Sequence, residues 1–93
     1  MKPSEILRAA KAKLTSETWG KEHSWQRPGK LCASEAIMAV AANDWKSWSA
    51  VWDILMPYTG KSLTNWNDAP KRTLAEVHAA FDAAITLAEA EGR

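Results

Sequence analysis

The sequence predicts an all-α protein, a compact bundle of about four helices forming a single domain over residues 1–93. Apolar residues recur at helical spacing in four separate segments. No segment alternates apolar and polar residues as a half-buried strand would, and no internal repeat appears. The apolar share of 46% and the charged share of 25% are those of an ordinary globular chain. A chain of 93 residues is also long enough to bury one core.

Local signals place each helix in order. Pro3 suits the first turn of the first helix, because its missing N–H would have no partner there. The second helix is rich in alanine, and we expect it to be central and the most buried. Pro57 should end the third helix. Thr73 and Glu76 form a capping box that opens the last one. The four helices are expected at about Pro3–Leu14, Leu31–Ala42, Trp45–Met56 and Thr73–Glu91.

Six tryptophans are the most unusual feature of the chain. Several recur at helical spacing along the third helix, and we expect Trp48 and Trp52 to lie inside. One small core cannot bury all six, so at least one of Trp19, Trp25 and Trp45 should be partly exposed. Tryptophan is enriched among binding hot spots. An exposed one would therefore mark a docking patch or a self-association seam.

The net charge is only +1, but it is unevenly distributed. Residues 1–30 carry a net charge of +4, and residues 73–93 carry −3. The end segments either solvate themselves and attract each other, or the basic one faces a charged partner. The candidate partner-binding residues are Trp19, Trp25, Trp45, Lys11, Lys21 and Arg27.

No catalytic, cofactor or metal site is predicted. Gly60-Lys61-Ser62 looks like the end of a phosphate-binding loop, but the motif's earlier glycine and its preceding strand are missing. His23, His78 and Cys32 stand in three separate segments, which is not metal-ligand spacing. A nucleophile built from Cys32, a histidine and Asp68 has no local signature. We therefore expect a non-enzymatic protein.

Localisation is expected to be cytoplasmic. The first residues lack the apolar stretch of a signal peptide, and no window approaches the ~20 apolar residues of a membrane span. The single cysteine cannot form an intrachain disulfide, which favours a reducing compartment.

Residues 63–68 read Leu-Thr-Asn-Trp-Asn-Asp, and Arg72-Thr73, Glu76-Val77, Phe81-Asp82 and Ala84-Ile85 follow. This pattern resembles an uncharacterised family of small proteins from actinobacteria and their phages. That family shows a Trp-Asn-Asp motif before a final helix opened by an Arg-Thr pair. The resemblance covers residues 31–90 and loosely the first helix. It implies a host-directed interaction protein, for which a coiled-coil scaffold of polar growth or division is one target.

The same motif has a structural interpretation that rests on the residues alone. Asn65, Asn67 and Asp68 can satisfy backbone amides at a turn, while Trp66 anchors the loop to the bundle. The chain then leads into the Thr73–Glu76 cap. We expect these five residues, Trp66, Asn67, Asp68, Thr73 and Glu76, to be structural rather than functional.

The leading hypothesis is a small protein-binding module, phage-encoded and directed at a host protein, with homo-oligomerisation left open. The alternative is a nucleic-acid-binding or regulatory protein that uses the basic N-terminal third with Trp19 and Trp25. Phosphate contacts weaken steeply with salt, whereas an interface centred on tryptophan should not.

Overall fold

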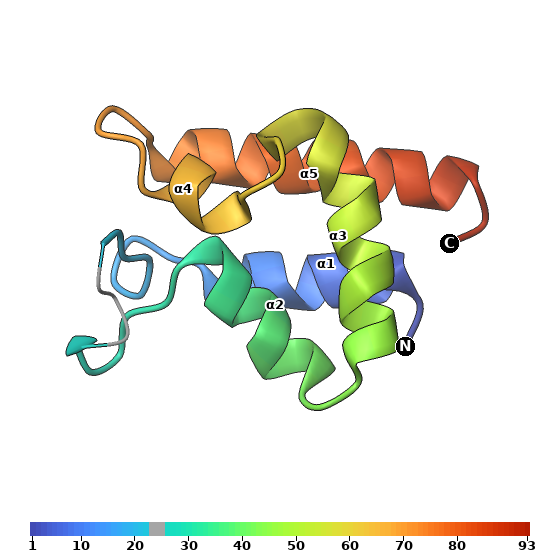
Figure 1. Ribbon diagram of the computed structural model, residues 1–93, viewed down its shortest axis with the longest axis horizontal. Coiled ribbons are helices and arrows are strands. Elements are labelled where there is room, and N and C mark those ends of the chain that lie inside the picture. The colour runs from blue at the N-terminus through green and yellow to red at the C-terminus, as the bar shows by residue number, and fades with distance from the viewer. Residues whose placement is uncertain (23–25) are drawn as a thin grey trace.

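The computed structural model describes residues 1–22 and 26–93 as five helices without a β-strand, and this confirms the all-α prediction (Figure 1). The helices are α1 (Pro3–Lys13), α2 (Ala33–Ala41), α3 (Trp45–Thr59), α4 (Leu63–Asn67) and α5 (Leu74–Ala90). Trp19 and Leu31 form one isolated parallel bridge across the loop between α1 and α2. The Cα radius of gyration, 12.1 Å, is close to the ~13 Å expected for a compact domain of this length.

The central helix of the bundle is α1. It packs against α5, α2 and α3, and Figure 1 shows it between α5 and α2. Its Ile6, Leu7 and Ala10 are buried. The expectation that the alanine-rich second helix would be the central, most buried one is therefore wrong. The small side chains of α2 let it approach α1 closely, but they cover little surface. Met38 remains exposed on the outer face of α2.

Two boundaries differ from the sequence-based expectation. α3 continues past Pro57 to Thr59, because a proline in the last turn removes a single helical hydrogen bond, and Gly60 then ends the helix at a φ of 79°. The segment from Leu63, expected as a turn, forms the short α4. Ser62 caps it by accepting a hydrogen bond from the Asn65 amide at 3.2 Å. One helical turn is too short for its apolar periodicity to be recognised in a sequence.

The charge asymmetry of the chain is partly resolved within the fold. Arg8 of α1 donates to both carboxylate oxygens of Glu89 of α5 at 2.9 Å. Lys11 Nζ lies 2.7 Å from Asp82 Oδ1 on the same pair of helices. The basic first helix and the acidic last helix therefore attract each other, as one of the two sequence interpretations expected. His78 of α5 adds a contact at 2.7 Å between its Nε2 and the carbonyl oxygen of Leu14. Since a carbonyl oxygen only accepts, Nε2 carries the proton.

The tryptophan stripe of α3 lies at the edge of the core rather than in it. Trp48 and Trp52 are only half-buried and stack on each other with ring centroids 5.3 Å apart. The prediction that both lie inside is therefore wrong. Val51, Ile54 and Leu55 occupy the inward face of α3 instead. The smaller side chains fit between the helices, and the two indoles cover the border of the core from outside.

A buried side-chain amide connects the loop before α2 to the short α4. Asn67 is fully buried, and its Oδ1 accepts hydrogen bonds from the Trp19 indole at 2.8 Å and from the Ala33 amide at 3.1 Å. Its Nδ2 donates to the Gly20 carbonyl at 3.1 Å and to Asp68 Oδ1 at 3.0 Å. Both groups that face Oδ1 are donors, and both groups that face Nδ2 are acceptors. The side-chain amide of Asn67 therefore fits only in this orientation and not with its oxygen and nitrogen exchanged.

The neighbours of Asn67 extend the same connection. Asp68 Oδ1 also accepts from the Glu22 amide at 3.0 Å. The Arg72 guanidinium lies 4.1 Å from the centroid of the Trp66 ring, and its Nε donates to the Trp66 carbonyl at 2.9 Å. The residues of the Trp-Asn-Asp motif thus hold the fold together, as the sequence interpretation expected.

The predicted capping box of α5 is also confirmed. The Glu76 amide donates to Thr73 Oγ1 at 3.2 Å, and the Thr73 amide donates to Glu76 Oε1 at 2.9 Å. The hydrogen bonds from Thr73 lower the pKa of the Glu76 carboxyl, so the cap is charged at neutral pH.

Replacing Asn67 by alanine should lower the free energy of unfolding by about 3 kcal/mol, because it leaves two buried N–H groups and a buried carbonyl without partners. Denaturant unfolding followed by tryptophan fluorescence measures this loss. Asn65→Ala, an exposed change on the same helix, should cost about 0.5 kcal/mol or less. Equal losses in the two variants would contradict the structural role of Asn67.

Candidate functional site

The tight turn between α2 and α3 brings two helix ends together at one corner of the molecule. The Ala42 amide donates to the Met38 carbonyl at 2.8 Å and ends α2. Asp44 then caps α3, accepting from the Ser47 amide at 3.3 Å and from the Ser47 hydroxyl at 2.7 Å. Trp45 follows as the first residue of α3. Only three residues separate the two helices, so the end of α2 and the start of α3 share one surface.

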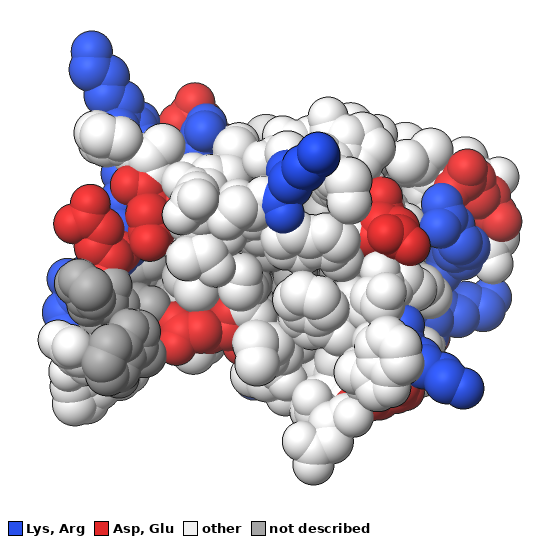
Figure 2. Space-filling model, viewed as in Figure 1, with Lys and Arg blue, Asp and Glu red and all other residues white. Residues whose placement is uncertain are grey.

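This corner carries two of the four large apolar side chains that are exposed among the described residues. Trp45 is 71% exposed and Met38 is 53% exposed. They border a shallow hollow of about 410 Å³. Its lining residues are Met38, Ala42, Asn43, Trp45 and Trp48. We call this surface the α2–α3 corner. Figure 2 shows that the face over α2 and α3 is mostly uncharged, with the charged side chains gathered mainly at its two ends.

Two features of the α2–α3 corner are unfavourable for folding. Ala42 adopts a φ of 52° with a ψ of −123°, a conformation that glycine adopts freely and that a residue with a Cβ adopts only with strain. The indole N–H of Trp48 is buried and has no hydrogen-bond partner in the part of the chain that the structure describes. Each costs on the order of 1–3 kcal/mol. Strained backbone clusters at functional sites, and an unpaired buried donor is rare enough in a folded protein to require an explanation.

The candidate partner-binding residues predicted from the sequence do not gather on one surface. Trp45 lies at the α2–α3 corner, and its exposure confirms that at least one of the three named tryptophans is partly exposed. Trp19 is half-buried and bonded to Asn67, which makes it a structural anchor. Trp25 and His23 lie outside the described residues.

The basic side chains among those candidates are engaged within the chain. Lys11 pairs with Asp82. Lys21 Nζ donates to the carbonyls of Ala69 and Pro70 at 2.8 and 3.2 Å, and it lies 5.6 Å from the centroid of the Trp19 ring. The Arg27 guanidinium donates to the carbonyls of Lys21 and Glu22. Lys21 and Arg27 therefore stabilise the loop between α1 and α2, and Lys11 joins α1 to α5. The three side chains do not form a common surface for binding phosphates.

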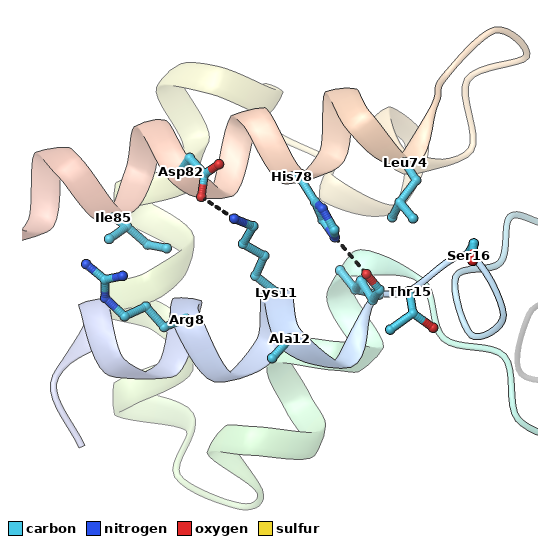
Figure 3. A pocket seen from close by; sticks show the side chains of 10 residues that line it. Arg8, Lys11, Ala12, Thr15, Ser16, Leu74, His78, Asp82 and Ile85 are labelled. Atoms are coloured by element: carbon cyan, nitrogen blue, oxygen red, sulfur yellow. Dashed lines mark hydrogen bonds and ion pairs between the residues drawn. The ribbon is translucent and has the colours of Figure 1, made fainter.

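A second, larger groove of about 710 Å³ runs between α1 and α5 (Figure 3). Leu14, Leu74 and Ile85 provide apolar lining. Figure 3 shows the Lys11–Asp82 ion pair crossing between the two helices and His78 pointing toward the end of α1. Both contacts join α1 to α5. We therefore interpret the groove as the outer edge of the seam between them.

Cys32 is buried at the N-cap of α2, where burial raises the pKa of its thiol. A protonated thiol is a poor nucleophile and a poor metal ligand. Within residues 1–22 and 26–93, no group of three or more histidine, cysteine, aspartate or glutamate side chains could hold a metal ion.

Sequence reasoning missed most of the α2–α3 corner. It named Trp45 but not Met38, Ala42, Asn43 or Trp48 as members of a site. The position of Met38 could have been found, since Ala33, Ala36 and Ile37 recur at helical spacing and leave it on the opposite face. The strain at Ala42 could not, because nothing in the residue type indicates a left-handed backbone.

None of the described helices is both long enough and apolar enough to span a membrane. Searches among curated proteins and among solved structures find no match. Residues 1–87 do match DUF6197, described as a family of unknown function. The match covers all five helices except the last turn of α5. The chain therefore belongs to the DUF6197 family.

Proposed function

We propose that this protein is a non-enzymatic protein-binding module that docks its partner at the α2–α3 corner. The observation that carries the proposal is the exposure of Trp45 and Met38 side by side over a hollow. A tryptophan is costly to leave in water and is enriched among hot spots, and methionine adapts its shape to different partners. The strained Ala42 and the unpaired Trp48 N–H support a function at the same place.

The resemblance to small proteins of actinobacteria and their phages supports a phage-encoded protein acting on a host protein in the host cytoplasm. A coiled-coil scaffold of polar growth or division is the target that we would test first. Such a scaffold exposes long helical surfaces, against which an aromatic patch can pack.

Nucleic-acid binding receives less support. Lys11, Lys21 and Arg27 contact a carboxylate or backbone carbonyls of this chain. Phosphate binding would have to displace those contacts. Trp19 holds the fold through Asn67, so its ring cannot leave to stack on a base without disrupting that connection.

Trp45→Ala should strongly weaken capture of a host protein. We expect tagged wild-type chain to retain one protein from actinobacterial lysate after nuclease treatment and at high salt, and the variant to bind it at least about 30-fold more weakly. Quantitative mass spectrometry of the bound fraction measures the loss, and titration of the purified pair gives the affinities.

The matched control is Tyr58→Ala, which removes an exposed aromatic ring from the other end of α3. It should leave capture unchanged. Thermal unfolding should show both variants folded. Capture that disappears with nuclease or salt would favour the nucleic-acid alternative. Equal capture by the Trp45→Ala and Tyr58→Ala variants would show that the α2–α3 corner does not bind the host protein.

Ala42→Gly should stabilise the protein, because glycine adopts the observed backbone conformation without strain. We expect a gain of about 1 kcal/mol and a rise in Tm of roughly 4–8 °C. The control Ala39→Gly, at an exposed position inside α2, should lower stability by about 0.5–1 kcal/mol. Calorimetry measures whether each variant is more or less stable than the wild type. An Ala42→Gly variant that is less stable would show that the Ala42 backbone is not strained.

A further inference from the structure

The exposed apolar surface of the α2–α3 corner continues past Asp44 toward the N-terminus. A second, smaller hollow of about 70 Å³ is lined by Met1, Ile6, Val40, Ala41, Asp44 and Ser47. Met1 is 70% exposed there. Asp44 lines this smaller hollow, and its chain neighbours Asn43 and Trp45 line the larger one. The carboxylate therefore stands at the border between one mainly apolar hollow and a smaller one whose lining is both polar and apolar.

Asp44 is charged and accessible. Ser47 donates from its amide and from its hydroxyl, and these hydrogen bonds lower the pKa of the Asp44 carboxyl. The N-terminal ammonium adds a weaker attraction. Within the described ranges, no lysine or arginine forms an ion pair with this carboxylate. A carboxylate can accept about four hydrogen bonds. Ser47 supplies two and the Lys46 amide a weaker third, so room for a further donor remains.

The position of Asp44 restricts what can cover the two hollows. A purely apolar partner would remove a charged carboxylate from water without compensation, which is costly. An acidic partner would meet like charge. A lysine or arginine would gain a charge-assisted hydrogen bond to Asp44, and its cation could lie against the exposed indole of Trp45.

We propose that the α2–α3 corner binds a peptide segment of its partner in which a lysine or arginine stands between apolar side chains. The apolar side chains occupy the two hollows, and the basic side chain pairs with Asp44 beside Trp45. This inference rests on the proposed protein-binding function and specifies the chemistry of the partner. A second copy of this chain is the competing occupant, and it would bring two copies of Asp44 into one interface.

A displayed peptide library selected on the immobilised full chain tests this proposal. We expect the enriched sequences to share a lysine or arginine flanked by apolar residues. Binding of the synthetic consensus peptide, followed by calorimetry, should fall at least about 30-fold in Trp45→Ala. It should fall about three- to tenfold in Asp44→Asn, a change that retains a good helix cap and removes the charge.

The exposed Lys46, next on α3, provides the matched control. Lys46→Ala should leave affinity unchanged or slightly raise it, since it removes a like charge from the neighbourhood of the peptide. Replacing the basic residue of the peptide by glutamine should match the loss in Asp44→Asn, and combining both changes should add nothing further, as expected for a direct contact.

The outcomes separate the two proposals. Peptides that depend on Trp45 but lack a basic residue, or that bind Asp44→Asn as tightly as wild type, overturn the inference and leave the proposed function standing. The inference is also overturned if no selected peptide loses affinity in Trp45→Ala. The proposed function is overturned if Trp45→Ala captures the host protein as well as the wild type does. Sedimentation velocity that shows a dimer lost in Trp45→Ala assigns the corner to a second copy and overturns the inference.

Discussion

The buried amide of Asn67 is the interaction on which the arrangement of the rest depends. A loop of 19 residues separates α1 from α2. In the described part of this loop, Trp19 and Leu31 form one isolated bridge. Asn67 connects the Trp19 indole and the Gly20 carbonyl in that loop to the first amide of α2. Because α4 supplies the amide, the end of α3 and the start of α2 are held near each other. This connection fixes the start of α2, and the packing of α2 against α1 and α3 then places the α2–α3 corner at its other end.

At the seam between α1 and α5, the opposite charges of the two end segments meet within the fold. A basic first segment containing tryptophan is compatible with nucleic-acid binding when it is considered by itself. In the fold, Arg8 and Lys11 face Glu89 and Asp82 across the seam. Exposed pairs of this kind contribute at most about 1 kcal/mol each to stability. Their main consequence is that these cations already have partners and that the two ends of the chain lie together.

The α2–α3 corner contains three features that lower the stability of the fold and that selection for stability alone would remove. A side chain is held on a backbone suited to glycine, an indole donor is buried without an acceptor, and another indole is left in water. All three belong to one turn of three residues and the helix ends beside it. Their concentration at one place, with Asp44 at its centre, is the physical reason for proposing a binding role for this surface rather than for the larger groove between α1 and α5.

Periodicity and local hydrogen bonding were enough to predict the helical class, the capping box at Thr73 and the structural role of the Trp-Asn-Asp motif. The sequence also indicated that one small core cannot bury all six tryptophans. Which of them stay outside was decided only by the tertiary structure. Val51, Ile54 and Leu55 occupy the narrow space against α1 and α5, and this displaces Trp48 and Trp52 to the border. The left-handed conformation of Ala42 likewise depends on how the ends of α2 and α3 must meet, which no residue pattern encodes.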